Sequence, residues 1–192
     1  MQKLSTLTPT PKGFTLIELL VVIAVLGVLA AGVLVAVNPA EQLAKGRDAG
    51  RISGVAQLGR VMEGYSTGVL DGRYQLAALP TTWQTAYLVA SGEIKNRVLL
   101  PSIGGGNDCT YAGGNEGNIC YTPMGSEIPP GSGRVSDATI WATLESNSSK
   151  KRAGCAAPKP VVIVTWIASQ GKTGLDCVSD PTQYPAVTDV LK

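Results

Sequence analysis

The sequence predicts an α+β protein in which a long amino-terminal helix crosses a membrane and then packs against a small antiparallel β-sheet. Three observations lead to this class. Twenty of the 24 residues at positions 14–37 are hydrophobic. Apolar residues then recur at roughly helical spacing over residues 40–66, and several short apolar runs separated by turn residues follow towards the carboxyl end.

The first apolar segment is long enough to span a bilayer. Residues 19–37 carry no charge, and a helix of 24 residues reaches about 36 Å, against about 30 Å for the hydrocarbon layer. A secretory signal peptide has a shorter apolar core, although small residues at Ala30 and Ala31 leave ordinary signal cleavage open as an alternative. Because the preceding tail is short and every cysteine follows the segment, we expect the amino terminus inside and the bulk outside.

Glu18 is the exception in this segment, because it places a carboxylate one turn inside an apolar helix. A charge in hydrocarbon costs a few kcal/mol, so such residues usually have a partner or a task. If the chain is cut between Gly13 and Phe14, a new α-amine appears four residues before Glu18. The amine of a neighbouring subunit could then neutralise the carboxylate. The alternative is a glutamate at the headgroup boundary, solvated by water.

The residues KGFTLIELLVVI at positions 12–23 resemble the leader junction and first helix of type IV pilins and pseudopilins. The resemblance implies that a prepilin peptidase cuts after Gly13 and methylates the amine of Phe14, and that Glu18 guides methylation and assembly. It also implies a pilin-like fold. Its four expected segments are a leader at residues 1–13, a transmembrane and filament-core helix at 14–38, an amphipathic stalk helix at 39–66 and an extracytoplasmic head at 67–192.

Small residues along the apolar helix favour close packing with other helices. Gly27 falls where stalks of the resembled family often carry a glycine that borders a stretch loosened in the filament, so we include it among the assembly residues. The proline that those stalks often carry eight residues later is Val35 here, and Pro39 follows. We therefore expect either a lower hinge or a kink at Pro39, where the ring removes an amide donor.

The stalk helix contains glycines that disfavour an autonomous helix, each by about 1 kcal/mol relative to alanine. These are Gly46, Gly50, Gly54, Gly59 and Gly64. We expect packing against the sheet or a neighbouring stalk to compensate, because glycines leave a smooth flank. A helix broken by loops is the alternative.

The head is expected to contain one short helix and an antiparallel sheet. A proline and two threonines at residues 80–82 predict the start of a helix that ends near Gly92, with Trp83 and Tyr87 turned inward. Residues 101–133 are rich in glycine and proline, which predicts a long loop with a short strand at 119–121. Strands are expected at 138–144, 161–168 and 175–178, with a turn at 170–174 between the last two.

The four cysteines form no CxxC motif and predict two disulfides in an oxidising exterior. They are Cys109, Cys120, Cys155 and Cys177. A Cys109–Cys120 bond would close the glycine-rich loop, and a Cys155–Cys177 bond would tie a loop to the last strand. The sequence leaves all three pairings open, and four buried thiols are the alternative.

Composition excludes several classes of function. A chain with 44% hydrophobic and 16% charged residues is not disordered, and a net charge of +2 is too small for a dedicated nucleic-acid binder. The chain has no histidine, which removes the usual general base and the commonest zinc ligand. We expect no enzyme activity, no cofactor and no metal. Asparagines and acids near Asp108 match no EF-hand spacing. The basic run at residues 150–152 is expected in an exposed loop, and it could touch DNA without other support.

The resemblance implies a structural subunit of a type IV pilus filament that serves adhesion, motility or DNA uptake. The implied partners are other pilin subunits in a helical homo- or hetero-polymer, the prepilin peptidase, an inner-membrane assembly platform with its ATPase motor, and the lipid bilayer. The subunit would wait in the bacterial cytoplasmic membrane and then move to an extracellular filament. A pseudopilin of a type II secretion system and a membrane-tethered ectodomain that does not polymerise are the alternatives.

Overall fold

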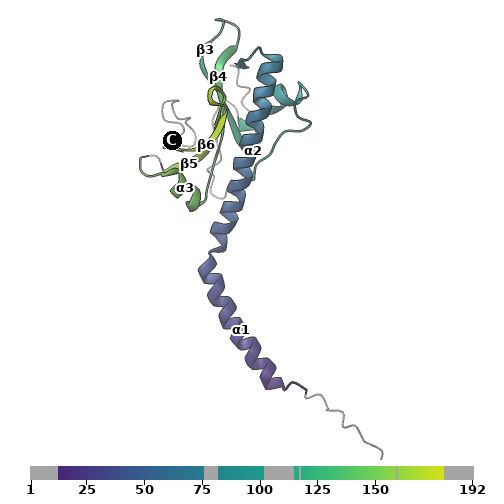
Figure 1. Cartoon of the computed structure of the whole chain (residues 1–192), viewed down its shortest axis with the longest axis vertical. Coiled ribbons are helices and arrows are strands. Elements are labelled where there is room, and N and C mark those ends of the chain that lie inside the picture. Colours follow the sequence, from purple (N-terminus) through teal and green to yellow (C-terminus); the bar gives the residue numbers. More distant parts are fainter. Residues whose placement is uncertain (1–12, 76–81, 102–114, 117, 159, 180–192) are drawn as a thin grey trace, which may run out of the picture. The chain divides into compact units, whose positions relative to one another are not determined.

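The computed structural model describes residues 13–75, 82–101, 115–116, 118–158 and 160–179. The chain divides into two compact units, Met1–Pro39 and Ala40–Lys192. In the part of the first unit that is described, the only secondary structure is the helix α1, whereas the second unit holds helix α2 and a β-sheet (Figure 1). The predicted α+β class, a long apolar helix together with an antiparallel sheet, is confirmed.

Helix α1, Leu16–Val37, is long and apolar enough to cross a membrane. It ends at Asn38, whose φ of 45° lies in the left-handed region. Asparagine tolerates this conformation better than most residues. Pro39 is then the first residue of the next helix. The backbone amide has no acceptor within the helix at this position, so proline, which lacks that amide hydrogen, is tolerated there. The kink that we expected at Pro39 is therefore a break between two helices.

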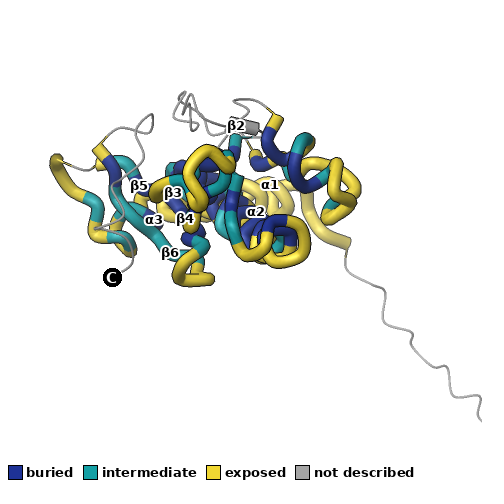
Figure 2. Tube along the Cα trace, turned by 90° about the horizontal axis from the view of Figure 1, so that it is seen from above, coloured by how far each residue is buried: buried dark blue, intermediate teal, exposed yellow. Residues whose placement is uncertain are grey.

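Helix α2, Pro39–Val69, has one face buried against the sheet and the opposite face exposed (Figure 2). The buried face carries Val55, Leu58, Met62 and Tyr65. The predicted helix over residues 40–66 is correct, and the glycines inside it are explained in part. Gly54 and Gly59 lie where a methyl group would overlap Leu100 and Trp166, respectively.

The sheet is antiparallel and runs in the order β2-β3-β4-β5-β6, with β1 paired to the beginning of β4. Its strands are β1 Tyr74–Gln75, β2 Asn115–Glu116, β3 Ile119–Glu127, β4 Arg134–Thr143, β5 Val161–Ile167 and β6 Lys172–Val178. Three of these were expected near their observed places. The turn between β5 and β6 is a 3-10 turn, η2 Ala168–Gln170, so Lys172 and Gly174 belong to a strand and our turn at 170–174 was placed too late.

Alternation along the central strands divides their side chains between two clusters. On one face, Tyr121, Ile140 and Trp166 pack with α2 in the main core. On the other face, Cys120, Trp141, Ile163 and Val178 form a smaller buried cluster. The head is therefore held on α2 by apolar contacts from the same strands that we predicted.

The short helix that we predicted after residue 82 is present as η1, Gln84–Val89, but it is a π-helix. The amide of Ala90 donates to the carbonyl of Thr85, five residues earlier, at 3.1 Å. Trp83 and Tyr87 are buried as expected, and Trp83 stacks on Tyr121 with ring centroids 5.4 Å apart. The expected capping residues 80 and 81 lie outside the described residues.

Two predictions for the second half of the head are wrong. The strand predicted at 119–121 is present, but it continues to Glu127 as the nine-residue strand β3, so the predicted loop at 101–133 is wrong in this part. Gly125, with a φ of 90°, sits where the register with β4 shifts, so the strand accommodates a residue that we had taken as a loop signal. Residues 150–152 lie in helix α3, Asn147–Ala153, rather than in an exposed loop. Ser146 caps this helix by accepting from the amide of Ser149.

Candidate processing and assembly site

The junction between Gly13 and Phe14 lies directly ahead of α1, outside any helix or strand. Both residues are exposed, and Phe14 has 87% of its surface accessible. No atom of the residues that the structure describes, apart from chain neighbours, lies within 4 Å of a methyl group built on Gly13. A peptidase can therefore approach this peptide bond from the side without unfolding a helix.

Thr15 and Glu18 form a capping box at the first turn of α1. The amide and the hydroxyl of Thr15 both donate to Glu18 Oε2, at 2.8 and 2.7 Å. In return, the amide of Glu18 donates to Thr15 Oγ1 at 3.3 Å. The carboxylate thus stabilises the amino-terminal end of α1, and it has a partner within its own chain.

Our sequence reasoning did not identify Thr15. Its signal was present as Thr-x-x-Glu ahead of an apolar run, which is the pattern of a capping box. The two hydrogen bonds engage only one carboxylate oxygen of Glu18. Within the described chain, Oε1 accepts no hydrogen bond, and Glu18 is exposed. Oε1 is therefore available to a cation outside this chain.

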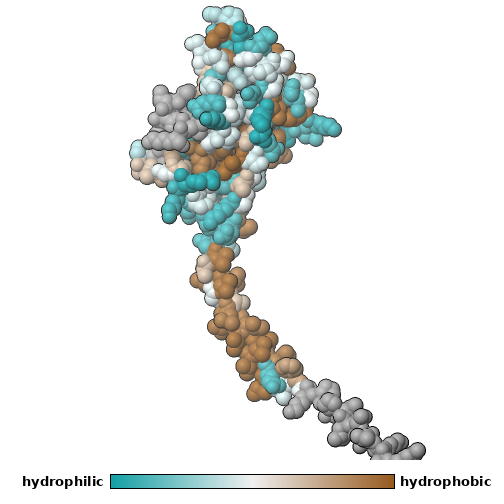
Figure 3. All heavy atoms as spheres, viewed as in Figure 1, coloured by the Kyte–Doolittle hydropathy of each residue, from teal (hydrophilic) through white to brown (hydrophobic). Residues whose placement is uncertain are grey.

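Helix α1 buries none of its side chains. Its visible face is hydrophobic over almost its full length (Figure 3). Shallow apolar grooves run along it, one of them lined by Phe14, Ile17, Glu18, Val21 and Val22. A methyl group built on Gly27 would meet no atom within 4 Å, so Gly27 leaves a flat place where a second helix can approach closely.

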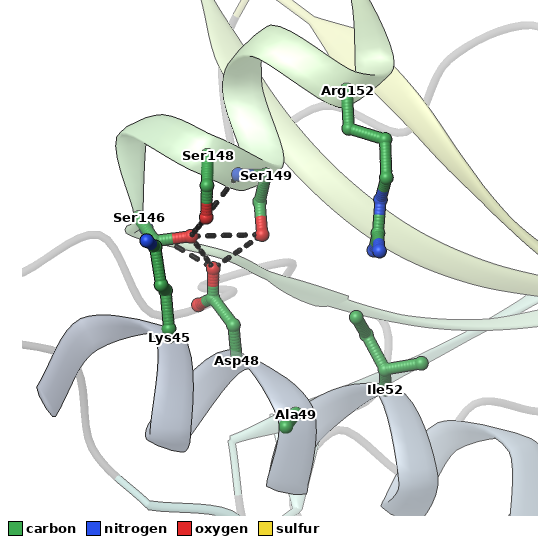
Figure 4. Close-up of a pocket in the computed structure, with 8 residues that line it drawn as sticks. All are labelled: Lys45, Asp48, Ala49, Ile52, Ser146, Ser148, Ser149 and Arg152. Carbon is green, nitrogen blue, oxygen red and sulfur yellow. Dashed lines mark hydrogen bonds between the residues drawn. The ribbon is translucent and has the colours of Figure 1, made fainter. Parts of the chain in front are cut away.

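A second polar group of residues, which the sequence reasoning missed, joins α2 to α3. Asp48 is buried on α2, and its Oδ1 accepts from the amide of Glu145 at 2.9 Å. Its Oδ2 accepts from the hydroxyls of Ser146 and Ser149, both at 2.6 Å (Figure 4). Buried polar groups need such partners, and Asp48 obtains four donors including the Ser146 amide at 3.1 Å.

Three further side chains of α2 form hydrogen bonds to the chain between the end of β4 and the first turn of α3. Glu41 accepts from the amides of Asn147 and Ser148 at 3.2 and 3.0 Å. Arg47 pairs with Glu145, and this hydrogen bond raises the pKa of the guanidinium. Arg51 is buried and donates to the carbonyl of Thr143 at 3.0 Å and to the carbonyl of Pro101. Glu41 therefore caps the amino terminus of α3.

Three cysteines of the head are among the described residues, and all three lie beyond α2. Cys155, which follows α3, is bonded to Cys177 of β6. Cys120 in β3 is also disulfide-bonded, and Cys109 lies outside the described residues. Among the residues described, no three His, Cys, Asp or Glu side chains come together in a group able to hold a metal ion.

The amino-terminal segment matches one family model. Residues 10–34 match the prokaryotic N-terminal methylation motif, which is the prepilin-type signature of type IV pilins and pseudopilins. The resemblance noted from the sequence is thereby confirmed. Neither a search of curated proteins nor a search of solved structures finds a match. The motif supports a pilin or pseudopilin class and points to a structural subunit.

Proposed function

We propose that the chain is a structural subunit of a type IV pilus filament that serves adhesion, motility or DNA uptake. One observation carries the proposal: an accessible Gly13–Phe14 junction stands one turn before Glu18, at the start of an apolar helix that buries no side chain. A simple membrane anchor needs neither the junction nor the acid.

The first step is removal of the leader, residues 1–13. A prepilin peptidase hydrolyses the bond after Gly13, which leaves the Gly13 carboxylate on the leader and a free amine on Phe14. The same class of enzyme then methylates that amine. The reference pKa of an α-amine is about 8, so the new chain end is mostly protonated at neutral pH.

The second step is packing of α1 against other copies. The ammonium group of Phe14 on one subunit binds the open Oε1 of Glu18 on the next, while Oε2 keeps its bonds to Thr15. An unpaired charge inside an apolar environment raises the free energy strongly. A helix whose position leaves the Phe14 ammonium or the Glu18 carboxylate unpaired is therefore disfavoured. The pair therefore sets the axial position of each new subunit.

Apolar contact stabilises α1 both before and after assembly. Burial is worth about 25 cal/mol per Å², and the surface of α1 is buried in lipid before assembly and among other α1 helices afterwards. The two states are close in free energy, so a motor on the inner-membrane platform can drive extension and retraction. We place residues 14–38 in the filament core, residues 39–66 in the stalk and residues 67–192 in the head.

The head fits the outer surface of such a filament. The bond between Cys155 and Cys177 fastens the edge strand β6, which has a paired neighbour on one side only among the described strands. Disulfides persist in oxidising surroundings outside the cytoplasm.

A pseudopilin in a type II secretion system shares the processing and packing steps, and it differs in forming no long surface filament.

The proposal is tested by shearing cells and imaging the released material by electron microscopy. Wild-type cells should release filaments that contain this chain, and Gly13→Val should abolish them and leave an uncut precursor in the membrane. Gly46→Val is the matched control, because Gly46 is also exposed with open space around it. Processed subunits without surface filaments would favour the pseudopilin, and normal processing of Gly13→Val would contradict the peptidase step.

A further inference from the structure

A cleft of about 250 Å³ lies between α2 and α3. Its walls are formed by Lys45, Asp48, Ala49 and Ile52 from α2 and by Ser146, Ser148, Ser149 and Arg152 from the α3 segment. The serine hydroxyls gather around Asp48 at one end, and Lys45 reaches towards them from α2 (Figure 4). Arg152 extends from α3 at the other side of the cleft (Figure 4).

The acidic groups around this cleft are engaged within the protein. Asp48 is enclosed by amide and hydroxyl donors, and Glu145 pairs with Arg47. Glu41 accepts from the first amides of α3, and Ser146 accepts from the amide of Ser149. The amino terminus of α3 is therefore already occupied by this protein's own side chains, and the cleft does not depend on it.

Three of the basic groups, in contrast, are exposed. These are Lys45, Lys151 and Arg152, and none forms an ion pair with any part of the chain that the structure describes. Residues 41–51 and 145–152 together carry six basic and three acidic side chains. This excess of three positive charges exceeds the net charge of +2 for the entire chain. The rest of the sequence is thus slightly negative, and the positive charge is concentrated here.

The cleft is also close along the chain to the apolar span. Lys45 follows Pro39 by six residues, which in a helix is a rise of about 9 Å. Because this distance is measured along α2 itself, it does not depend on the direction in which α2 leaves the membrane. The hydrogen bonds from Asn147 and Ser148 to Glu41 fasten α3 to the first turn of α2. A subunit anchored through α1 therefore keeps Lys45 within about one Debye length of the end of the apolar span.

We infer that the cleft between α2 and α3 is a binding site for the phosphate of an anionic lipid headgroup on the outer face of the cytoplasmic membrane. Lys45 and Arg152 supply both the charge and the hydrogen-bond donors at the two sides of the cleft. The inference rests on the membrane-anchored subunit of the proposed function. Docking would hold the head on the bilayer until the subunit is lifted into the filament.

Lipid fits this site better than DNA does, because tethering raises the local concentration of headgroups. An anchored chain meets lipid phosphates in an intramolecular manner, whereas duplex DNA has to reach the cleft from solution. A small cleft with two cations at its sides also suits a single phosphate. Duplex DNA is usually gripped by a longer stripe of basic residues.

The test is a lysine-reactivity experiment on the full chain in nanodiscs. The discs contain phosphatidylcholine alone, or phosphatidylcholine with an equal amount of phosphatidylglycerol. Acetylation of each lysine by an amine-reactive ester is followed by mass spectrometry. We expect the rates at Lys45 and Lys151 to fall by about fivefold in the anionic discs, the effect of about one basic residue at a charged surface. The acetylation rates of Lys95 and Lys172, which are exposed elsewhere on the head, should be the same in both kinds of disc. Added salt should remove the protection of Lys45 and Lys151.

The variant Lys45→Glu with Arg152→Glu should lose the protection at Lys151. Lys95→Glu with Lys172→Glu makes the same change in charge on other exposed sites and should keep it. Thermal unfolding of both variants shows whether the fold is intact. Inorganic phosphate and duplex DNA are each added to the neutral discs as further arms.

Equal reactivity in the two kinds of disc would overturn the inference while leaving the filament proposal in place. Protection by inorganic phosphate or by DNA in neutral discs, equal to that given by phosphatidylglycerol, would overturn the lipid assignment in favour of that ligand. Protection that survives in the Lys45→Glu, Arg152→Glu variant would place the site elsewhere. If the chain does not enter the discs at all, both the inference and the membrane-anchored subunit are wrong.

Discussion

Gly59 of α2 lies directly against the indole ring of Trp166 in β5. A methyl group built on Gly59 would overlap ring atoms of Trp166, which is itself buried. Trp166 also makes an edge contact with Tyr74, with ring centroids 6.4 Å apart. The ring is therefore held on two sides and cannot easily move away. The absence of a side chain at Gly59 is what lets the helix approach the sheet this closely.

Gly59→Ala should destabilise the head. Forcing a methyl group into a packed contact costs about 1–3 kcal/mol, which outweighs the gain of about 1 kcal/mol from replacing a helical glycine. The matched control is Gly46→Ala, because no atom lies within 4 Å of that position and only the helix gain applies. Urea unfolding of the full chain in detergent measures both. A Gly59→Ala chain at least as stable as Gly46→Ala would contradict the close packing.

The sequence was sufficient to predict the elements whose signals are local and strong. The apolar helix, the helix over residues 40–66 and the strand at β5 each show a clear periodicity or an unbroken apolar run. The candidate site at Gly13, Phe14 and Glu18 was found for the same reason, because its residues lie within six positions of one another.

The rest depends on contacts between distant residues. Strand β3 contains Pro123 and Gly125, which read as loop signals, and it is held as a strand by its pairing with β4. Helix α3 has seven residues and a basic sequence with little apolar periodicity. It is fastened by Glu41 and Asp48, which come about 100 residues earlier in the chain. Spacing along the sequence contains no signal for such contacts.

The roles of Glu18 in charge and in capping can be separated by substitution. Glu18→Gln keeps an oxygen that can accept from the Thr15 amide but removes the charge, so we expect it to enter the membrane and fail to assemble. Thr15→Val removes the capping hydroxyl and keeps the carboxylate. We expect it to assemble, with α1 less stable by about 1 kcal/mol at its first turn.

Filament yield by electron microscopy and methylation of the chain end by mass spectrometry give the two readouts. The account requires a large loss for Glu18→Gln and a small one for Thr15→Val. If both substitutions abolish assembly equally, the capping box is required as well as the charge, and the charge alone does not explain the role of Glu18. If neither does, the carboxylate is incidental.

Stability should fall at high pH because two tyrosines are buried. Burial raises the pKa of Tyr121 and, less strongly, the pKa of Tyr74 above the ordinary value of about 10. Below that pH both states of the protein keep these protons, so there is no effect. As the pH rises above it, the unfolded chain loses protons that the folded chain retains, and the free energy of unfolding falls by about 1.4 kcal/mol per pH unit for Tyr121. Tyr74 contributes in the same direction.

Tyr121→Phe isolates one of these contributions. The Tyr121 hydroxyl donates to the carbonyl of Gln75 at 2.7 Å, so its removal should cost about 1 kcal/mol at neutral pH. Above pH 10 the variant should lose stability less steeply than the wild type. Unfolding curves measured at several alkaline pH values provide the comparison, and identical slopes would mean that Tyr121 does not titrate as its burial requires.

The measurement that tests the account most directly is the intact mass of the subunit taken from assembled filaments, without reduction. The account predicts a chain that begins at Phe14, carries one methyl group on its amine and lacks four hydrogens because its four cysteines form two disulfides. A filament built from chains that still begin at Met1 would contradict it, since Glu18 would then face no new positive chain end on its neighbour.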